Sequence, residues 1–437
     1  METSTEKKMS SAEIIAKHKE FLFPSVANYY KEPLAIDRGD GLYVYDPEGN
    51  KYLDFFGGIL TVSVGHCNPK VTKKIHAQLD KLQHMSTLYP TENIVRLAEK
   101  LANISPGKLK KSFFTCSGTE ANETAVFMAK NYTKNHEIIA LRHSYGGRSQ
   151  LAMTLMGHST WKHGVPQVAG VKHAVSPYCY RCPFGLTYPS CELKCAQDIE
   201  DIIITTTTGS VAAFMAEPIQ GVGGFITAPK EYFKVAVPIV KKYGGVFICD
   251  EVQTGFGRTG KHMFGIKHWD VEPDIMTGAK GIANGAPVGM TIATPEIADS
   301  FVGLSISTFG GNPVSMAAAL ATIEVMEEEN LADNAEKVGN HLRAGLEEIQ
   351  KKHKSIGDVR GMGLMQACEF VKENKVPDPA LVIRLFEEMK KEKILIGKGG
   401  LFGNVVRISP GLIVSKTEVD EFLLVFDRAL YRAEKEN

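Results

Sequence analysis

Two patterns of apolar residues alternate along the middle of the chain. Short runs that predict strands lie at Lys111 to Cys116, Ile138 to Leu141, Val211 to Ala216 and Val246 to Cys249, and helical spacing covers 69–83, 91–102 and 231–242. Strands that alternate with helices predict a mainly parallel, doubly wound sheet, which binds ligands at the carboxyl ends of its strands. The expected fold class is therefore α/β.

Both ends of the chain depart from this alternation. Residues 41–46 and 51–54 alternate apolar and polar positions around a Pro-Glu-Gly-Asn turn, which predicts a β-hairpin. Beyond residue 312, helical patterns surround strand-like segments at 364–371 and 405–408. We expect a large domain over 55–312 and a smaller α+β domain built from 1–54 and 313–437.

Composition narrows the class of partner. The 437 residues are 43% hydrophobic and 23% charged, as in ordinary globular proteins, and 50 basic residues balance 50 acidic ones. No basic field favours nucleic acid or an anionic membrane, so small molecules are the expected partners. Residues 1–8 carry acids and no apolar core, and no apolar run reaches the roughly 20 residues of a membrane span, so a cytoplasmic location is expected.

Four of the eight cysteines are clustered. Their spacing is C-x2-C-x8-C-x3-C, formed by Cys179, Cys182, Cys191 and Cys195. The first pair has the spacing of a metal knuckle, so a zinc or iron–sulfur site and free or locally oxidised thiols both stay open. Nearby prolines and a glycine predict a loop, and no metal ligand is assigned.

The strongest candidates for catalytic residues follow the apolar run Val246 to Cys249, which ends at Asp250 and Glu251. A buried strand here delivers an acid at its carboxyl end. Thirty residues on, Lys280 follows another apolar run and has no charged neighbour closer than Asp274. A buried carboxylate with a desolvated lysine suits pyridoxal phosphate: the lysine forms a Schiff base with the aldehyde, and the aspartate keeps the pyridine nitrogen protonated. A structural Asp and a solvated Lys are the plain alternative.

Three further stretches lie after predicted strands. Small residues at 117–119 open a helix and offer N–H groups and hydroxyls to an anion, although Ser117 with Glu120 is also a plain helix cap. Tyr145 and Arg148 present a ring and a guanidinium in one loop. Residues 255–260 match G-x-G-x-x-G, but no apolar helix follows, and His262 stands where a P-loop needs Ser or Thr.

In this order, the motifs resemble the class III, or ω-amino-acid, pyridoxal-phosphate aminotransferases, and among them the alanine–glyoxylate and 4-aminobutyrate enzymes most. The likeness covers about Pro24 to Arg432 and is carried by residues 62–66, 216–221, 250–258, 279–281 and 308–313. It implies a fold-type I transferase that acts as a homodimer or as a dimer of dimers. It also implies a ping-pong transfer from alanine, β-alanine or 4-aminobutyrate to 2-oxoglutarate, pyruvate or glyoxylate.

The resemblance also implies a role for each matched residue. Those that would hold the cofactor are Lys280 at the aldehyde, Asp250 at the pyridine nitrogen, Val252 on the ring face, Gln253 near the phenolic oxygen, Gly118 and Thr119 at the phosphate, Tyr145 stacked on the ring, and Thr308 at the phosphate of the partner subunit. Arg407 would bind the substrate α-carboxylate, and Glu217 would pair with Arg407 when an ω-amine is bound. Arg148 would bind a second carboxylate.

Two features depart from the family pattern. Gly146 replaces the usual histidine after Tyr145, and the cysteine cluster has no general counterpart. Two competing hypotheses therefore stay open. One is another pyridoxal-phosphate enzyme on the same scaffold, such as an amino-acid racemase or a phospholyase, and the other is a thiol–metal binding module with inactive catalytic motifs.

Overall fold

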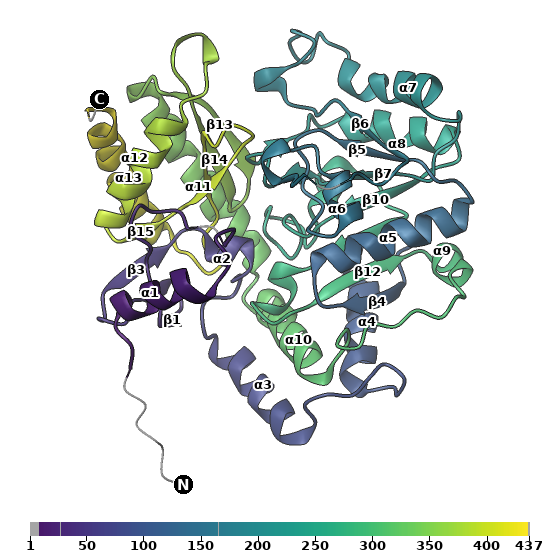
Figure 1. Ribbon diagram of the computed structural model, residues 1–437, viewed down its shortest axis with the longest axis horizontal. Coiled ribbons are helices and arrows are strands. Elements are labelled where there is room, and N and C mark those ends of the chain that lie inside the picture. The colour runs from purple at the N-terminus through teal and green to yellow at the C-terminus, as the bar shows by residue number, and fades with distance from the viewer. Residues whose placement is uncertain (1–7, 27, 165, 436–437) are drawn as a thin grey trace.

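A large sheet and a group of smaller sheets lie side by side in the computed structural model, which describes residues 8–26, 28–164 and 166–435 (Figure 1). The expected cytoplasmic location rests in part on residues 1–8, and residues 1–7 lie outside the described residues. Within the described ranges, no helix is long and apolar enough to cross a membrane.

The large sheet has seven strands. Their order is β4 (Lys111–Thr115), β12 (Gly289–Ala293), β11 (Ile275–Gly278), β10 (Val246–Asp250), β7 (Ala213–Ala216), β5 (Ile138–Leu141) and β6 (Val171–Ala174). β12 runs antiparallel to both of its neighbours, and the other pairs are parallel. The carboxyl ends of the parallel strands therefore meet at one edge, beside β10.

Helices cover both faces of this sheet, and its central strands β7, β10 and β11 are buried at every position. Alternate residues such as Ile248 and Met215 pack with α5 (Gly118–Thr133) and α6 (Gln150–Leu155). Their neighbours, such as Phe247 and Phe214, pack with α7 (Lys194–Thr206) and α8 (Tyr232–Lys242). This two-sided burial is the doubly wound arrangement that the sequence predicts.

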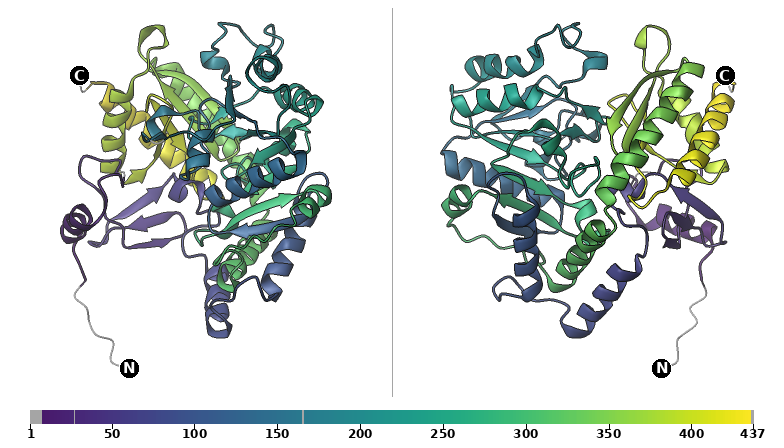
Figure 2. Two further views of the ribbon diagram at one scale, coloured as in Figure 1. Left: turned by 45° about the vertical axis from the view of Figure 1, so that its right-hand side comes forward. Right: turned by 180° about the vertical axis from the view of Figure 1, so that it is seen from behind.

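Two four-stranded sheets, one of which joins the two ends of the chain, lie beside the large one, and β8 (Ile219–Gln220) and β9 (Ile226–Thr227) pair as a separate two-stranded sheet. One four-stranded sheet is antiparallel, in the order β13 (Ile356–Met362), β14 (Met365–Phe370), β17 (Val405–Ile408) and β16 (Gly397–Gly399). In the other, β1 (Arg38–Asp40), β2 (Tyr43–Tyr45) and β3 (Lys51–Asp54) are extended by β15 (Ile394–Leu395), which runs parallel to β3. Figure 2 accordingly shows the purple N-terminal strands beside the yellow C-terminal elements.

The remaining elements surround these sheets. They are α1 (Ser11–Phe21), α2 (Gly57–Leu60), α3 (Pro69–Lys81), α4 (Glu92–Ile104), α9 (Pro295–Ser300), α10 (Pro313–Glu328), α11 (Leu331–Lys352), α12 (Pro379–Lys391) and α13 (Lys416–Lys435). Short 3-10 turns include Cys179–Arg181, Gly265–Trp269 and Lys280–Ala283.

The α/β class and the hairpin of β2 and β3 are confirmed. The sequence patterns missed β6 and β12, so the antiparallel strand inside the large sheet was not expected. The domain boundaries at residues 54/55 and 312/313 stay predictions.

Candidate active site

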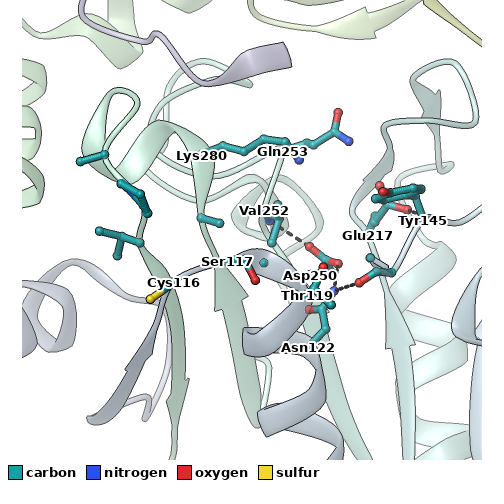
Figure 3. A pocket seen from close by; sticks show the side chains of 17 residues that line it. Cys116, Ser117, Thr119, Asn122, Tyr145, Glu217, Asp250, Val252, Gln253 and Lys280 are labelled. Carbon is teal, nitrogen blue, oxygen red and sulfur yellow. Dashed lines mark hydrogen bonds between the residues drawn. The ribbon is translucent and has the colours of Figure 1, made fainter. Parts of the chain in front are cut away.

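A cavity of about 250 Å³ opens at the carboxyl edge of the large sheet, between the end of β10 and the first turn of α5 (Figure 3). Eight of the predicted site residues line it: Gly118, Thr119, Tyr145, Glu217, Asp250, Val252, Gln253 and Lys280. Thr308, Arg407 and Arg148 are not among its lining residues. The structure thus brings together residues that lie up to 162 positions apart in the chain.

Asp250 ends β10 and is only 5% exposed. The backbone N–H of Val252 donates to its Oδ1 over 2.9 Å, and Asn122 Nδ2 donates to its Oδ2 over 2.9 Å. Burial raises the pKa of Asp250, while these two hydrogen bonds and the nearby Lys280 act in the opposite direction. Asp250 is therefore a fixed, buried acceptor at the floor of the cavity.

Lys280 follows β11 and has a φ of +50°, a left-handed backbone that a lysine seldom adopts. Burial lowers the pKa of Lys280 to about 8, and Arg407 lowers it further, against the attraction of Asp250 and Glu217. Among the described residues its ammonium group forms no ion pair. Lys280 therefore holds a reactive amine at mildly alkaline pH.

The first turn of α5 forms the opposite wall. Ser117 caps the helix, because its Oγ accepts from the Glu120 N–H over 3.2 Å, so the plain capping role is present. The first N–H groups of a helix still lack partners inside the helix. A Cβ on Gly118 would lie 3.0 Å from a Val252 methyl carbon, which makes glycine the residue that keeps this wall open.

Glu217 accepts two backbone hydrogen bonds, from Tyr145 N–H over 3.0 Å and from Gly221 N–H over 2.7 Å. Burial, and next the charge of Asp250, raise the pKa of Glu217 to about 8. The Tyr145 ring lies 5.7 Å from the Trp161 ring in an edge-on contact. No sequence motif had pointed to Trp161.

Arg407 lies in β17 with 4% exposure, outside the lining of the cavity but within electrostatic reach of Lys280 and Glu217. Its Nε donates to the Lys398 carbonyl over 2.9 Å, and its guanidinium lies 4.9 Å from the centre of the Phe56 ring. Burial lowers the pKa of Arg407. In the described part of the chain it has no ion-pair partner, so it is a buried cation available to an anionic ligand.

Arg148 and Thr308 are both exposed. The Arg148 N–H donates to Thr119 Oγ1 over 3.2 Å, which ties this loop to α5, and its guanidinium lies close enough to lower the pKa of Tyr145 against the effect of burial. Thr308 lies in the exposed segment between α9 and α10, beside Ser307, whose side chain reaches Cys116 at the cavity rim.

The structure explains why position 146 holds glycine and not the usual histidine. A Cβ at this position would lie 2.7 Å from the Ala152 carbonyl oxygen, so no side chain fits. The Gly146 carbonyl accepts a hydrogen bond from Asn122 Nδ2 over 2.9 Å, and the same amide donates to Asp250. Asn122, which is 1% exposed, is therefore a site residue that the sequence analysis missed.

Two sequence features lie outside this cavity. The glycine-rich turn of residues 255–260 uses its N–H groups in hydrogen bonds to nearby backbone: Gly257 N–H donates to Met263 O, and Gly260 N–H donates to Gly257 O. These groups are therefore not available to bind a phosphate. Cys195 lies in the first turn of α7, and not in a loop as predicted. All eight cysteines are free, and among the described residues no group of three or more His, Cys, Asp or Glu side chains is placed to hold a metal ion.

The cavity suits a ring that carries an aldehyde and a phosphate. Gln253 Oε1 is buried without a hydrogen-bond partner among the described residues, so it can accept from a ligand. Asp250 provides a carboxylate for a ring nitrogen, the first turn of α5 provides donors for a phosphate, and Lys280 provides an amine. This donor set fits pyridoxal phosphate.

Comparisons with known proteins agree with this geometry. The chain is 45% identical over 420 residues to alanine–glyoxylate aminotransferase 2 homolog 2, mitochondrial, from Arabidopsis thaliana, covering 95% of this chain and 87% of that protein. It is 36% identical to a leucine/methionine racemase from Thermococcus litoralis, covering 98% and 97%. An amine transaminase structure from an uncultivated Pseudomonas species, in its PLP-bound form, superposes with a TM-score of 0.89 at 32% identity, covering 94% and 98%.

The family profile described as aminotransferase class-III matches residues 25–430, nearly the whole chain. The profile and the PLP-bound structure agree with the cavity in pointing to one cofactor and one type of reaction. The chain belongs to the class III aminotransferase family and is a pyridoxal-phosphate-dependent transaminase.

Proposed function

We propose that this transaminase moves the amino group of alanine, β-alanine or 4-aminobutyrate to 2-oxoglutarate, pyruvate or glyoxylate in two half-reactions. The observation that carries the proposal is the buried Asp250 and the half-buried Lys280 within electrostatic reach of Arg407, a buried cation without an ion-pair partner in the described chain. Asp250 and Lys280 suit a cofactor that reacts with amines, and Arg407 suits a carboxylate, so together they fit an amino-acid substrate.

When bound, pyridoxal phosphate supplies an aldehyde for amines and a ring that accepts electrons from the substrate carbon. Lys280 Nζ is proposed to hold the aldehyde and, once released, to move the proton between substrate and cofactor carbons. Asp250 is proposed to hold a proton on the ring nitrogen through the oxygens that Val252 N–H and Asn122 orient. The depressed pKa of Lys280 favours the neutral amine that both of its tasks require.

The other cofactor contacts are proposed from their places on the walls. Gly118 and Thr119 provide donors for the phosphate at the first turn of α5. Tyr145 would cover one face of the ring and Val252 the other, and the Oε1 of Gln253, which has no partner among the described residues, would face the phenolic oxygen. Excluding water from both ring faces strengthens the electrostatic contacts inside the site.

Substrate carboxylates are proposed to bind Arg407 through two parallel N–H···O bonds, the arrangement that a planar guanidinium favours. An ω-amine substrate leaves no carboxylate there. Glu217 can then neutralise Arg407, since the two side chains already affect each other electrostatically. Burial raises the pKa of Glu217, which favours its neutral form while a substrate carboxylate occupies Arg407. When no carboxylate is bound there, the charge of Arg407 favours ionisation of Glu217.

Arg148 is proposed to bind the second carboxylate of 2-oxoglutarate, or the single carboxylate of β-alanine or 4-aminobutyrate. Its guanidinium is exposed, lies near Tyr145 and has no ion-pair partner among the described residues. The alternative is that Arg148 only anchors its loop through the N–H bond to Thr119. Arg148→Ala distinguishes these roles because it removes the guanidinium and keeps that N–H.

The experiment is a panel of amino donors against 2-oxoglutarate, pyruvate and glyoxylate, with wild type and Arg148→Ala. We expect the variant to lose about 2 to 4 kcal/mol of transition-state binding for 2-oxoglutarate, which is a decrease of roughly 30-fold to 800-fold in kcat/KM, and much less for the two monocarboxylates. An equal decrease for all three acceptors, or a wild type that ignores 2-oxoglutarate, would contradict the role of Arg148.

We further propose that the enzyme is a homodimer, or a dimer of such dimers, in which Thr308 reaches the cofactor phosphate of the partner subunit. Large apolar side chains stand exposed in the two segments beside Thr308, including Leu88, Val302 and Leu304. Contact between the His84 and Phe309 rings, 5.3 Å apart, joins these segments into one surface. A cytoplasmic location stays a prediction, and the Arabidopsis relative is named as mitochondrial.

An amino-acid racemase is the second candidate, and the likeness to the Thermococcus enzyme favours it. A racemase needs no 2-oxo acid, whereas an aminotransferase cannot complete its cycle without one. Incubation of the holoenzyme with a single L-amino acid, followed by chiral chromatography, distinguishes the two. Catalytic accumulation of the D-enantiomer without a 2-oxo acid would exclude the aminotransferase proposal.

A further inference from the structure

A second cavity, of about 600 Å³, lies apart from the catalytic one, between the turn of residues 261–270, the end of β9 and β13. Three of the charged side chains that line it are lysines: Lys230, Lys261 and Lys267. All three are exposed, and within the described ranges none of their ammonium groups forms an ion pair. Asp270, the acid in the lining, is already paired with Lys234 over 3.2 Å. The cavity therefore carries an excess of positive charge.

The glycine-rich turn accounts for the place of Lys261. A Cβ on Gly260 would lie 2.8 Å from Glu336 Cα, so glycine permits the turn to pack directly against α11. The Lys261 N–H then donates to the Ala332 carbonyl over 3.0 Å, with a φ of +59°. A left-handed conformation is strained for a lysine, and such strained residues cluster at ligand clamps. The motif therefore serves to present a side chain, since its N–H groups are used within the turn.

Imidazole rings form the wall beside these lysines. The His262 and His268 rings meet edge-on at 5.0 Å. Burial, then Lys267 and Lys261, lower the pKa of His262, against the opposite effect of Glu336 and Asp270, which places both ammonium groups close to this ring. A neutral imidazole offers hydrogen bonds and a flat surface without adding charge.

We propose that this cavity is a binding site for the phosphate group of a small phosphomonoester. Lysine ammonium groups act as point charges and suit a tetrahedral dianion, whereas a planar carboxylate is usually recognised by the arginine fork, and no arginine lines the described cavity. The volume exceeds what a phosphate alone requires, so the imidazole rings, Ala228 and Met362 are left for the organic part of the ligand.

The test uses the holoenzyme, in which the cofactor's own phosphate occupies the catalytic cavity. Glucose 6-phosphate, inorganic phosphate, glucose and glutarate are titrated by calorimetry. We expect one saturable site per chain for glucose 6-phosphate, no binding of glucose, and weaker binding as KCl rises from about 20 to about 200 mM. Equal binding of inorganic phosphate would still support phosphate recognition, whereas equal binding of glutarate would overturn it.

Variants locate the site. Lys261→Gln with Lys267→Gln should weaken glucose 6-phosphate binding by about tenfold or more, because charge-assisted contacts are lost. Lys354→Gln with Lys416→Gln removes two exposed lysines elsewhere and should leave binding unchanged. Transamination by the first variant should match wild type, which shows that the fold persists. Unchanged binding in that variant, or no saturable binding of either phosphate probe to wild type, would overturn the proposal.

Discussion

At the scale of residues, the proposed chemistry depends most on the environment of the Lys280 amine. Because burial lowers its pKa to about 8, a larger share of the amine is neutral at pH 8 than an exposed lysine would allow. In cofactor-free protein, the rate of Lys280 labelling by an amine-selective reagent, followed by peptide mass spectrometry, should therefore rise with pH with a midpoint near 8.

Exposed lysines in the same sample provide the reference and should titrate about two units higher. Lys280→Ala should remove the labelled peptide and abolish transamination while leaving the unfolding curve unchanged within about 1 kcal/mol, since one pocket side chain contributes little to stability. A midpoint for Lys280 as high as that of the exposed lysines would contradict its burial, and residual turnover in the variant would contradict its role.

Asn122 positions the aspartate that the proposed mechanism requires. Loss of its amide leaves Asp250 Oδ2 without a donor, which costs about 1 to 3 kcal/mol, so Asn122→Ala should reduce kcat/KM by roughly 5-fold to 160-fold and weaken cofactor binding. Asn131→Ala is the matched control, because among the described residues its amide donates to the Ser300 carbonyl alone. If both variants retain wild-type cofactor affinity, Asn122 has no positioning role.

The roles of single residues could be predicted from the sequence where they depend on the residues next to them in the chain. Asp250 and Lys280 each follow an apolar run, so the chain itself indicates a buried acid and a desolvated amine. The Asn122 contact could not be predicted, because its partner Asp250 lies 128 residues away and a single Asn in a helix pattern carries no signal of that contact. The buried and unpaired state of Arg407 likewise depends on packing between β17 and distant loops.

At the scale of elements, the loop between β5 and α6 depends on the close packing of Gly146. Gly146→Ala places a Cβ 2.7 Å from the Ala152 carbonyl, so we expect a loss of about 1 to 3 kcal/mol in unfolding free energy, measured by urea denaturation. Gly164→Ala, where a Cβ meets nothing within 4 Å, should change stability by no more than about 0.5 kcal/mol. Equal stability of the two variants would show that the loop can shift to make room.

Element order was largely predictable, because helical and strand periodicities differ sharply in this chain. The exceptions have a physical cause. β6 has a mixed sequence at the edge of the sheet, and β12, which is buried on both faces, contains glycine and threonine among its apolar residues. Its antiparallel direction follows from the tertiary path of the chain after Lys280, which no local pattern encodes.

At the scale of the whole molecule, the proposed dimer makes the site of one chain depend on Thr308 of the other. Light scattering should give twice the 47.9 kDa of one chain, or four times that mass for a dimer of dimers. Leu304→Asp places a charge in the proposed interface, and we expect it to shift the enzyme toward monomer and to lower activity at least about tenfold. Leu424→Asp, at an equally apolar exposed position in α13, should do neither. A wild type that is monomeric and fully active would contradict the proposal.

The most direct test of the account is a single half-reaction. Holoenzyme receives an excess of the best amino donor and no 2-oxo acid, and the visible absorbance and the 2-oxo product are followed. Two half-reactions through one cofactor predict about one product molecule per chain, with the cofactor left in its pyridoxamine form until a 2-oxo acid is added. Return of the aldehyde-form spectrum with continued conversion of the donor would contradict the account and identify a racemase or a lyase instead.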